Sequence, residues 1–366
     1  MIDNLRSLTL EQKIGQLFFI GVPGPEADGP TRELLSEISP GGICLFARNI
    51  REAAQTRQLL DDIRAFVPIE PLLSIDQEGG LVDRLRRVMT PMPAASAISS
   101  VEGARELAEI IGETLGVLGF NMDFAPVVDV IDAERAGYTN GLVSRTFGRS
   151  HEDTTLLAAE FLTVLQSIGI TGCIKHFPGL GASRVDSHEQ LPLVDIDEAQ
   201  WRSVDLYPYT SLIASGAVRA VMVAHASFPK LDLQERGQNG TLLPSSLSYN
   251  IVTSLLRREL RYGDLVITDD LEMGAIKNNY GIGEACKMAI AAGVDMLAIC
   301  ADPAAIREGY HAVFDATRAG AISTERIDQS LDRIAKAKSY IAPPPDFDSD
   351  RLLALSDRVV RLAEHS

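Results

Sequence analysis

Short apolar runs alternate with longer helical stretches along this 366-residue chain, and this alternation is the strongest constraint on its fold. Each run is rich in β-branched or other apolar residues, and each precedes a stretch with the 3.6-residue periodicity of an amphipathic helix. The pattern is typical of repeated βα units and a parallel sheet, whose strands are buried on both faces. Eight such runs occur, over residues 14–22, 42–47, 71–76, 122–130, 169–177, 218–226, 265–269 and 295–300.

Eight βα units without a long linker predict an α/β fold, a single (β/α)8 TIM barrel. An open, doubly wound sheet shows the same alternation and is the alternative. We assign the barrel to residues 1–341 and a linker with one short C-terminal helix to residues 342–366, since the segment after the proline run at 343–345 is too short for a core of its own. Helix starts are predicted at Ser100 and at Asp153 and Thr154.

Composition limits the partners that this chain is expected to bind. Its 50 acidic and 34 basic residues give a formal net charge of −16, so nucleic acid and anionic membranes are not expected partners, whereas a small neutral ligand is. The four cysteines occur singly and predict no disulfide framework. A signal-peptide pattern and a long apolar run are both absent from the sequence, which predicts a cytoplasmic protein.

Polar residues gather where the predicted strands end, which is where a barrel of this kind carries its chemistry. The third run leads into I-D-Q-E-G-G-L-V-D-R, with Asp76 and Arg84, and this acid-rich segment indicates a binding loop rather than a solvated turn. The fifth run ends at Lys175 and His176 and continues into a loop rich in glycine. These positions are therefore the first candidates for contacts with a ligand.

The loop after the fifth run also holds a possible proton-transfer pair. Asp186 and His188 lie two residues apart, and a carboxylate at this distance can select the imidazole tautomer and raise its basicity. A loop histidine that is merely capped by its neighbour is the structural alternative. Pro178, Gly179 and Gly181 in the same loop suggest that it closes over a bound ligand.

Two adjacent carboxylates, Asp269 and Asp270, end the seventh run. In a strand they point to opposite sides, so we expect one to face the barrel axis as a candidate nucleophile and Asp270 to cap the next helix. His225 ends the sixth run, and a buried core histidine without a catalytic role is the alternative there. Arg145 follows the fourth run as a possible ligand contact, and a surface ion pair is the alternative. The histidine spacing matches no standard metal-ligand pattern, and the sequence contains no nucleotide-binding motif. We therefore expect neither a metal nor a cofactor.

These segments resemble the β-N-acetylglucosaminidases of glycoside hydrolase family 3. The resemblance rests on I-D-Q-E-G-G, K-H-F-P-G, D-S-H-x-x-L-P and T-D-D-L-x-M, and it spans about residues 8–340. It implies a (β/α)8 barrel that removes terminal β-linked N-acetylglucosamine with retention, typically from muropeptides during cell-wall recycling. Leu81, Leu180 and Ala182 differ from the usual family pattern, which has arginine, histidine and aspartate at these positions.

The resemblance also implies roles for individual residues. Asp269 matches the nucleophile, His188 the acid/base and Asp186 the carboxylate paired with it. His225 is given only a supporting role. The residues that match sugar-binding positions are Asp76, Arg84, Arg145, Lys175 and His176. Three alternatives stay open: a phosphorylase that uses phosphate as acceptor, a β-glucosidase, and a catalytically inactive sensor of wall fragments.

Overall fold

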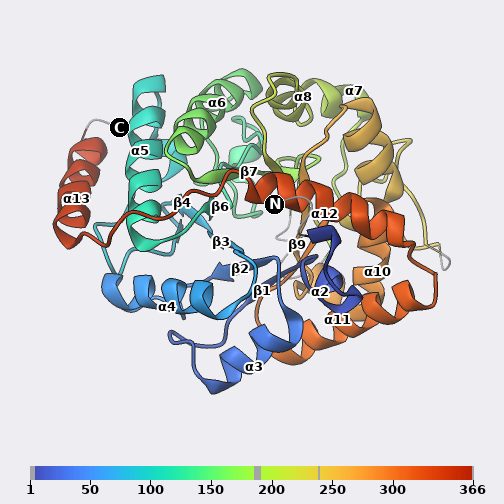
Figure 1. The fold of residues 1–366 in the computed structure, drawn as a ribbon. Helices are drawn as coiled ribbons and strands as arrows, with labels where there is room; N and C mark the ends of the chain where they lie inside the picture. The colour runs from blue at the N-terminus through green and yellow to red at the C-terminus, as the bar shows by residue number, and fades with distance from the viewer. Residues whose placement is uncertain (1–4, 185–190, 238–239, 365–366) are drawn as a thin grey trace.

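The computed structural model describes residues 5–184, 191–237 and 240–364. Within these ranges eight parallel strands form a closed barrel in the order β1-β10-β9-β8-β7-β6-β3-β2 (Figure 1). The closed order confirms the predicted (β/α)8 barrel, and the open-sheet alternative is wrong because β1 pairs with both β2 and β10. The strands are β1 Phe18–Gly21, β2 Gly42–Leu45, β3 Leu72–Ile75, β6 Met122–Asp123, β7 Thr171–Phe177, β8 Ala220–Val223, β9 Leu265–Asp270 and β10 Met296–Ile299.

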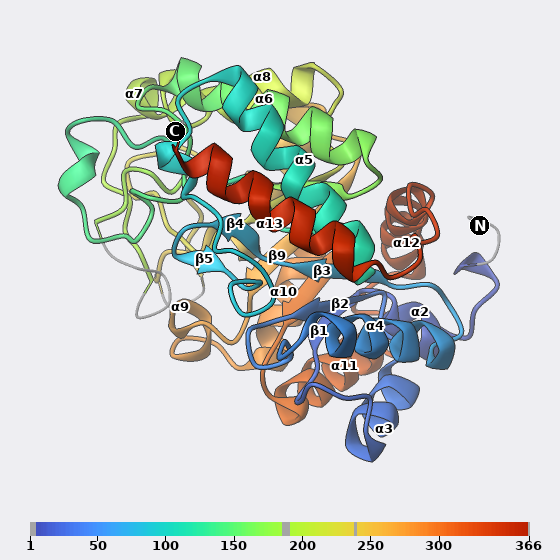
Figure 2. The same ribbon diagram turned by 90° about the vertical axis from the view of Figure 1, so that its left-hand side faces the viewer.

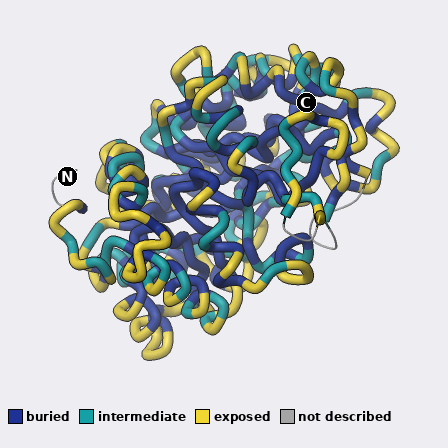
Figure 3. Tube along the Cα trace, turned by 90° about the vertical axis from the view of Figure 1, so that its right-hand side faces the viewer, coloured by how far each residue is buried: buried dark blue, intermediate teal, exposed yellow. Residues whose placement is uncertain are grey.

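Helices cover the outside of the barrel and bury their apolar faces against it, so the buried part of the chain is central and the exposed part lies on the outer turns (Figure 3). A two-stranded hairpin, β4 Gln77–Gly79 and β5 Val82–Asp83, extends from the end of β3. The helices are α2 Leu10–Gly15, α3 Gly29–Ile38, α4 Ala53–Phe66, α5 Val101–Leu118, α6 His151–Ser167, α7 Glu198–Ser203, α8 Tyr207–Ala214, the π-helical segment Asn250–Glu259, α9 Gly274–Lys277, α10 Ile282–Ala292, α11 Pro303–Arg318, α12 Thr324–Lys338 and α13 Ser349–Glu364.

Several element boundaries differ from the sequence prediction. The first part of the run at 14–22 belongs to α2, and β6 covers only two residues of the run at 122–130, although Val127 still forms a bridge with Lys175 of β7. Ser100 caps α5 as predicted, because its side chain accepts a hydrogen bond from the N–H of Gly103. The predicted start of α6 is wrong by about one turn, because the cap is Ser150, which accepts from the N–H of Asp153.

The C-terminal helix α13 lies alongside α5 on the outside of the barrel (Figure 2). Leu352, Leu355 and Val359 are buried on its inner face. Arg358 of α13 forms ion pairs with three glutamates of α5, which are Glu106, Glu109 and Glu113. In the described part of the chain, no helix combines the length and the apolar character that a membrane crossing requires.

A buried lysine contacts the chain just before the start of β1. The Lys338 ammonium, at the end of α12, donates a hydrogen bond of 2.7 Å to Oε1 of Gln16, and burial lowers the pKa of Lys338 to about 7. The unfolded chain binds a proton on this lysine below about pH 10.4. The free energy of unfolding therefore falls between about pH 10 and pH 7, because only the unfolded chain gains the proton in that range.

Lys338→Met is expected to raise the free energy of unfolding at pH 7 by about 2 kcal/mol, because it removes this proton-linked penalty. Urea unfolding at pH 7 and near pH 10 measures the effect, and the gain should vanish at the higher pH. Lys336→Met is the control, since Lys336 is half-exposed and pairs with Asp264 at the surface. Equal unfolding midpoints of wild type and Lys338→Met at pH 7 would contradict the expectation.

Candidate active site

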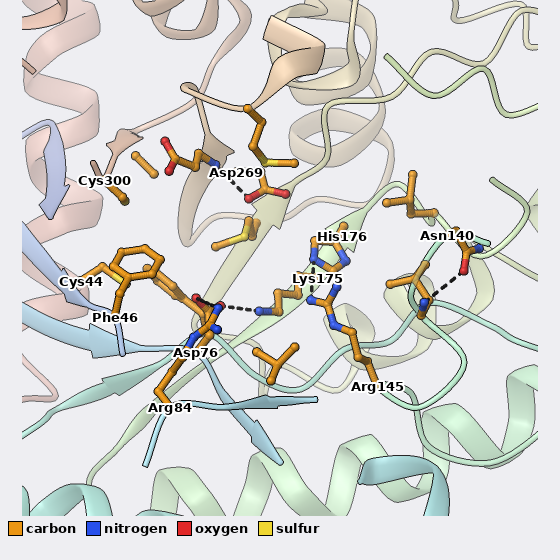
Figure 4. A pocket seen from close by; sticks show the side chains of 18 residues that line it. Cys44, Phe46, Asp76, Arg84, Asn140, Arg145, Lys175, His176, Asp269 and Cys300 are labelled. Carbon is orange, nitrogen blue, oxygen red and sulfur yellow. Dashed lines mark hydrogen bonds and ion pairs between the residues drawn. The ribbon is translucent and has the colours of Figure 1, made fainter. Parts of the chain in front are cut away.

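A cavity of about 260 Å³ lies where the barrel strands end, near the lower limit of the roughly 300–1,000 Å³ of typical ligand pockets. Figure 4 shows the labelled side chains around it. Its lining includes six of the predicted site residues, which are Asp76, Arg84, Arg145, Lys175, His176 and Asp269. The structure therefore brings together residues that lie far apart in the sequence. Asp186 and His188 lie outside the described residues.

Lysine and arginine side chains bind two carboxylates on one side of this cavity. The Lys175 ammonium at the end of β7 lies 2.6 Å from Oδ1 of Asp76 and 2.6 Å from Oε1 of Glu78. Arg145 donates two parallel hydrogen bonds to Glu78, of 2.7 and 2.9 Å. Arg84 is more distant, with 3.9 Å from Nη2 to Oδ2 of Asp76. Asp76 and Arg84 thus keep polar atoms available for a ligand at the cavity.

The charges of this network stabilise one another. Burial alone would raise the pKa of Glu78, but Arg145 and Lys175 lower it well below its usual range. Burial opposes the charge of Lys175 as well, whereas Asp76 and Glu78 raise its pKa above the usual range. Glu78, Arg145 and Lys175 are therefore ionised at neutral pH, and Lys175, which is almost completely buried, acts as a fixed positive charge beside the cavity.

A buried aspartate orients His176. Nδ1–H of His176 donates a hydrogen bond of 2.7 Å to Oδ2 of Asp129, which leaves Nε2 as an acceptor, 3.4 Å from Nη2 of Arg145. Asp129 also accepts a hydrogen bond of 2.6 Å from the N–H of Leu180. The same carboxylate therefore positions both the imidazole and the start of the loop that follows β7. The side chain of Leu180 lines the cavity at the position that usually carries histidine in the resembling family.

Asp269 lies at the end of β9 and presents its carboxylate to the cavity. Oδ1 accepts a hydrogen bond of 2.8 Å from the N–H of Asp270. Burial alone would raise the pKa of Asp269, but the imidazoles of His176 and His225, the N–H of Asp270 and the Lys175 ammonium lower it below its usual value. The carboxylate is thus ionised and hydrogen-bonded on one oxygen, which is the state a carboxylate nucleophile requires.

The adjacent Asp270 does not behave as the sequence predicted. The expectation that it caps the next helix is wrong, because α9 starts after Met273, and Asp270 instead accepts a hydrogen bond of 3.1 Å from the N–H of Glu272. The expectation that only one of the two carboxylates faces the barrel axis stays a prediction: both residues line the cavity, and the Asp270 carboxylate contacts the turn that follows β9. Burial, with the charges of Glu272 and Asp269, raises the pKa of Asp270 to about 7.

His225 follows β8 and contacts the backbone at the end of β9. Its Nε2–H donates a hydrogen bond of 3.1 Å to the carbonyl of Asp270, and its Nδ1 accepts one of 2.7 Å from the hydroxyl of Ser246. Burial lowers the pKa of His225, which favours the neutral ring that these two contacts require. His225 touches the backbone next to Asp269 and does not line the cavity, which is compatible with the predicted supporting role.

The loop after β7 is packed closely at its base. Gly179 has a φ of +109°, and a Cβ there would lie 2.8 Å from the Cβ of Asp205. A Cβ at Gly181 would lie 2.2 Å from the carbonyl oxygen of Val130. Asn140 donates a hydrogen bond of 3.2 Å to the carbonyl of Gly181. Both glycines are needed for close packing, so their presence does not by itself argue for a mobile loop.

Glu78 and Asp129 are not among the site residues predicted from the sequence, although the structure places both beside predicted site residues. Glu78 belongs to the quoted I-D-Q-E-G-G segment, and Asp129 is a lone acid within an apolar run, a pattern that marks a buried and paired carboxylate. Among the described residues, no group of three or more histidine, cysteine, aspartate or glutamate side chains is arranged to hold a metal ion.

Comparisons with known proteins agree with this fold and cavity. The family described as "Glycosyl hydrolase family 3 N terminal domain" matches residues 9–337. The "Beta-hexosaminidase" of Pseudomonas aeruginosa is 35% identical over 280 residues, which cover 75% of this chain and 79% of that protein. The "Beta-hexosaminidase A" of Pseudoalteromonas piscicida is 32% identical over 335 residues, which cover 84% of this chain but only 55% of that protein.

Solved structures extend the likeness to three dimensions. The structure of a glycoside hydrolase family 3 beta-N-acetylglucosaminidase from a Paenibacillus species matches with a TM-score of 0.87 and 35% sequence identity, covering 98% of this chain and 69% of that chain. The likeness therefore covers the barrel and the residues around its cavity. The chain belongs to glycosyl hydrolase family 3, in its β-N-acetylhexosaminidase branch.

Proposed function

We propose that this chain is a retaining exo-β-N-acetylglucosaminidase that hydrolyses terminal β-linked N-acetylglucosamine through a glycosyl-aspartate intermediate. The observation that carries the proposal is the ionised Asp269 carboxylate at the end of β9, which faces a cavity bordered by Asp76, Arg84 and Arg145. The names of the relatives from Pseudomonas aeruginosa and Paenibacillus support the same activity. We further propose muropeptides as substrates and the cytoplasm as the place of action.

In this mechanism Asp269 attacks the anomeric carbon of the sugar through an oxocarbenium-like transition state. His188, paired with Asp186, protonates the departing oxygen and then deprotonates the water that hydrolyses the glycosyl-aspartate. Each step inverts the configuration at the anomeric carbon, so the product retains it. The positive charges of Lys175 and Arg145 lower the pKa of Glu78, and Asp76, which Lys175 contacts, has carboxylate oxygens that can accept hydrogen bonds from sugar hydroxyls.

The direct test is an assay with para-nitrophenyl β-N-acetylglucosaminide and the corresponding β-glucoside, each with and without phosphate. The proposal predicts release from the acetylated sugar alone, with free N-acetylglucosamine as product. Formation of a sugar 1-phosphate would identify a phosphorylase, preferred cleavage of the glucoside would identify a β-glucosidase, and tight binding without turnover would identify a sensor. Each of these three results would overturn the proposal.

Arg145→Lys is expected to lower kcat/KM by roughly 10–100-fold, the effect of losing a charge-assisted hydrogen bond. Lysine cannot form the two parallel bonds to Glu78 while it also approaches Nε2 of His176. Steady-state kinetics with the aryl substrate measure the change. Arg105→Lys is the matched control, because Arg105 pairs with Glu160 on the surface, and it should leave kcat/KM unchanged. An Arg145→Lys variant within twofold of wild type would contradict the role.

Asp186→Ala is expected to slow turnover by roughly 10²–10⁴-fold without abolishing sugar binding, because the imidazole of His188 loses the carboxylate that raises its basicity. The loss should be larger for a substrate with a poor leaving group than for the nitrophenyl glycoside, since protonation matters more for the poor one. Kinetics on both substrates and product binding by calorimetry measure this. An equal loss on the two substrates, or a loss of product binding, would argue against the acid/base pair.

A further inference from the structure

Two of the four cysteines share one wall of the cavity. Cys44 lies in β2 and Cys300 follows the end of β10 directly, and both line the cavity (Figure 4). In the barrel these strands flank β1, and Gly21 of β1 pairs with Cys44 and contributes no side chain at this level. We call Cys44 and Cys300 the cysteine pair.

The two cysteines are free and do not form a disulfide. The Cys44 thiol donates a weak hydrogen bond of 3.8 Å to the carbonyl of Leu45. The neighbouring Cys44 side chain, burial and the nearby charges of Asp270 and Asp76 raise the pKa of Cys300 well above its usual range. The Cys300 thiol is therefore protonated at neutral pH, and oxidants that require a thiolate react slowly with it.

The strand positions favour a bridged ligand over a disulfide. Cys44 and Cys300 are separated by two strand spacings, or about 9–10 Å between backbones before the curvature of the barrel is considered. A disulfide requires Cα atoms about 4.4–6.8 Å apart, so it would need movement of the backbone. An atom that binds both sulfurs allows the two sulfurs to lie farther apart than in a disulfide. Sulfur ligands prefer soft elements, so the bridging atom is expected to be soft.

We propose that the cysteine pair is a binding site for a neutral, thiophilic trivalent metalloid of the arsenous acid type, and that its occupation blocks the cavity. Arsenous acid carries no charge at neutral pH, so the carboxylates near the pair do not repel it. Two As–OH bonds and two S–H bonds break, two As–S bonds form, and the two protons leave with the two hydroxyls as water. Arsenic stays trivalent, so the step needs no oxidant.

The test is arsenite binding to the full chain, measured by native mass spectrometry and by peptide mapping. One arsenic should bind per chain, and the affinity should fall at least 100-fold in Cys44→Ala and in Cys300→Ala. Cys44→Ser and Cys300→Ser repeat the test if an alanine variant does not fold. Cys286→Ala is the matched control, because Cys286 is buried in α10 and does not line the cavity, and it should bind like wild type.

Absence of binding to wild type, or unchanged binding to the Cys300 variants, would overturn the proposal. Rapid formation of a Cys44–Cys300 disulfide with diamide would contradict the spacing on which it rests. Because binding is read by mass, the result is independent of the proposed glycosidase activity. Where that activity is present, arsenite should inhibit wild type and Cys286→Ala, and a dithiol such as dimercaptopropanol should restore both.

Discussion

Asp269→Ala is expected to reduce kcat on an aryl β-N-acetylglucosaminide by roughly 10⁴–10⁶-fold, because it removes the group that forms the covalent intermediate. The fold should be retained, since Asp269 is only partly buried at a strand end and its hydrogen bond to the N–H of Asp270 is local. Because its pKa is lowered, wild-type activity should show no acid limb from Asp269 above about pH 4.

Trapping identifies the nucleophile independently of the rate. A 5-fluoro N-acetylglucosaminyl donor should label wild type on the peptide that contains Asp269. Asp270→Asn is the matched control, because it changes the neighbouring carboxyl of the same cavity and should still be labelled at residue 269. Azide should partly restore turnover in Asp269→Ala by replacing the missing nucleophile. A label on any other residue, or normal turnover of purified Asp269→Ala, would refute the proposed mechanism.

Asp295→Ala is expected to lower the free energy of unfolding by about 3–5 kcal/mol, the cost of leaving buried charges unpaired. Asp295 is fully buried just before β10. It pairs with Arg257 of the π-helical segment and, at 2.9 Å, with Arg333 of α12, and it accepts a hydrogen bond of 3.1 Å from the N–H of Val266 in β9. One carboxylate thus joins a strand to the helices that cover this end of the barrel.

The pH dependence of unfolding distinguishes this role from simple packing. Burial opposes ionisation of Asp295, but the arginines around it lower its pKa below the usual value. Its contribution to stability is therefore complete above about pH 4 and is lost as the pH falls through the lowered pKa. Wild type should lose this contribution in acid, and Asp295→Ala should not.

Urea unfolding measures the difference. Asp332→Ala in the same helix α12 is the control, because Asp332 pairs with the exposed Arg6 and its loss should cost less than about 1 kcal/mol. A loss below 1 kcal/mol in Asp295→Ala would show that the arginines around it are stable without their carboxylate.

The barrel and most of the cavity could be predicted from the sequence because both follow from local patterns. A strand buried on two faces must be apolar along its length, and the change to polar residues at its end marks the edge where loops meet. Asp76, Lys175, His176 and Asp269 all lie at such changes, and the structure places all four around one cavity. The parallel arrangement of the strands accounts for this convergence.

The pairs of side chains that contact each other between different βα units could not be predicted from the sequence in this way. The bond from His176 to Asp129 and the bidentate pair of Arg145 with Glu78 join segments whose spacing in the sequence carries no signal. The hydrogen bond between the Asp270 carboxylate and the N–H of Glu272 depends on the turn that follows β9. The proximity of Cys44 and Cys300 likewise depends on the closure of the barrel around β1.

The sequence by itself determined the βα repeat, the ends of the strands and the family to which the chain belongs, because each of these depends on short stretches of neighbouring residues. The tertiary structure alone decided which carboxylate faces which cation, which carboxylate orients the His176 imidazole and which cysteines line the same cavity. These pairings depend on the closure and curvature of the barrel, which bring distant segments within a few ångströms of one another and set the charge state of each group.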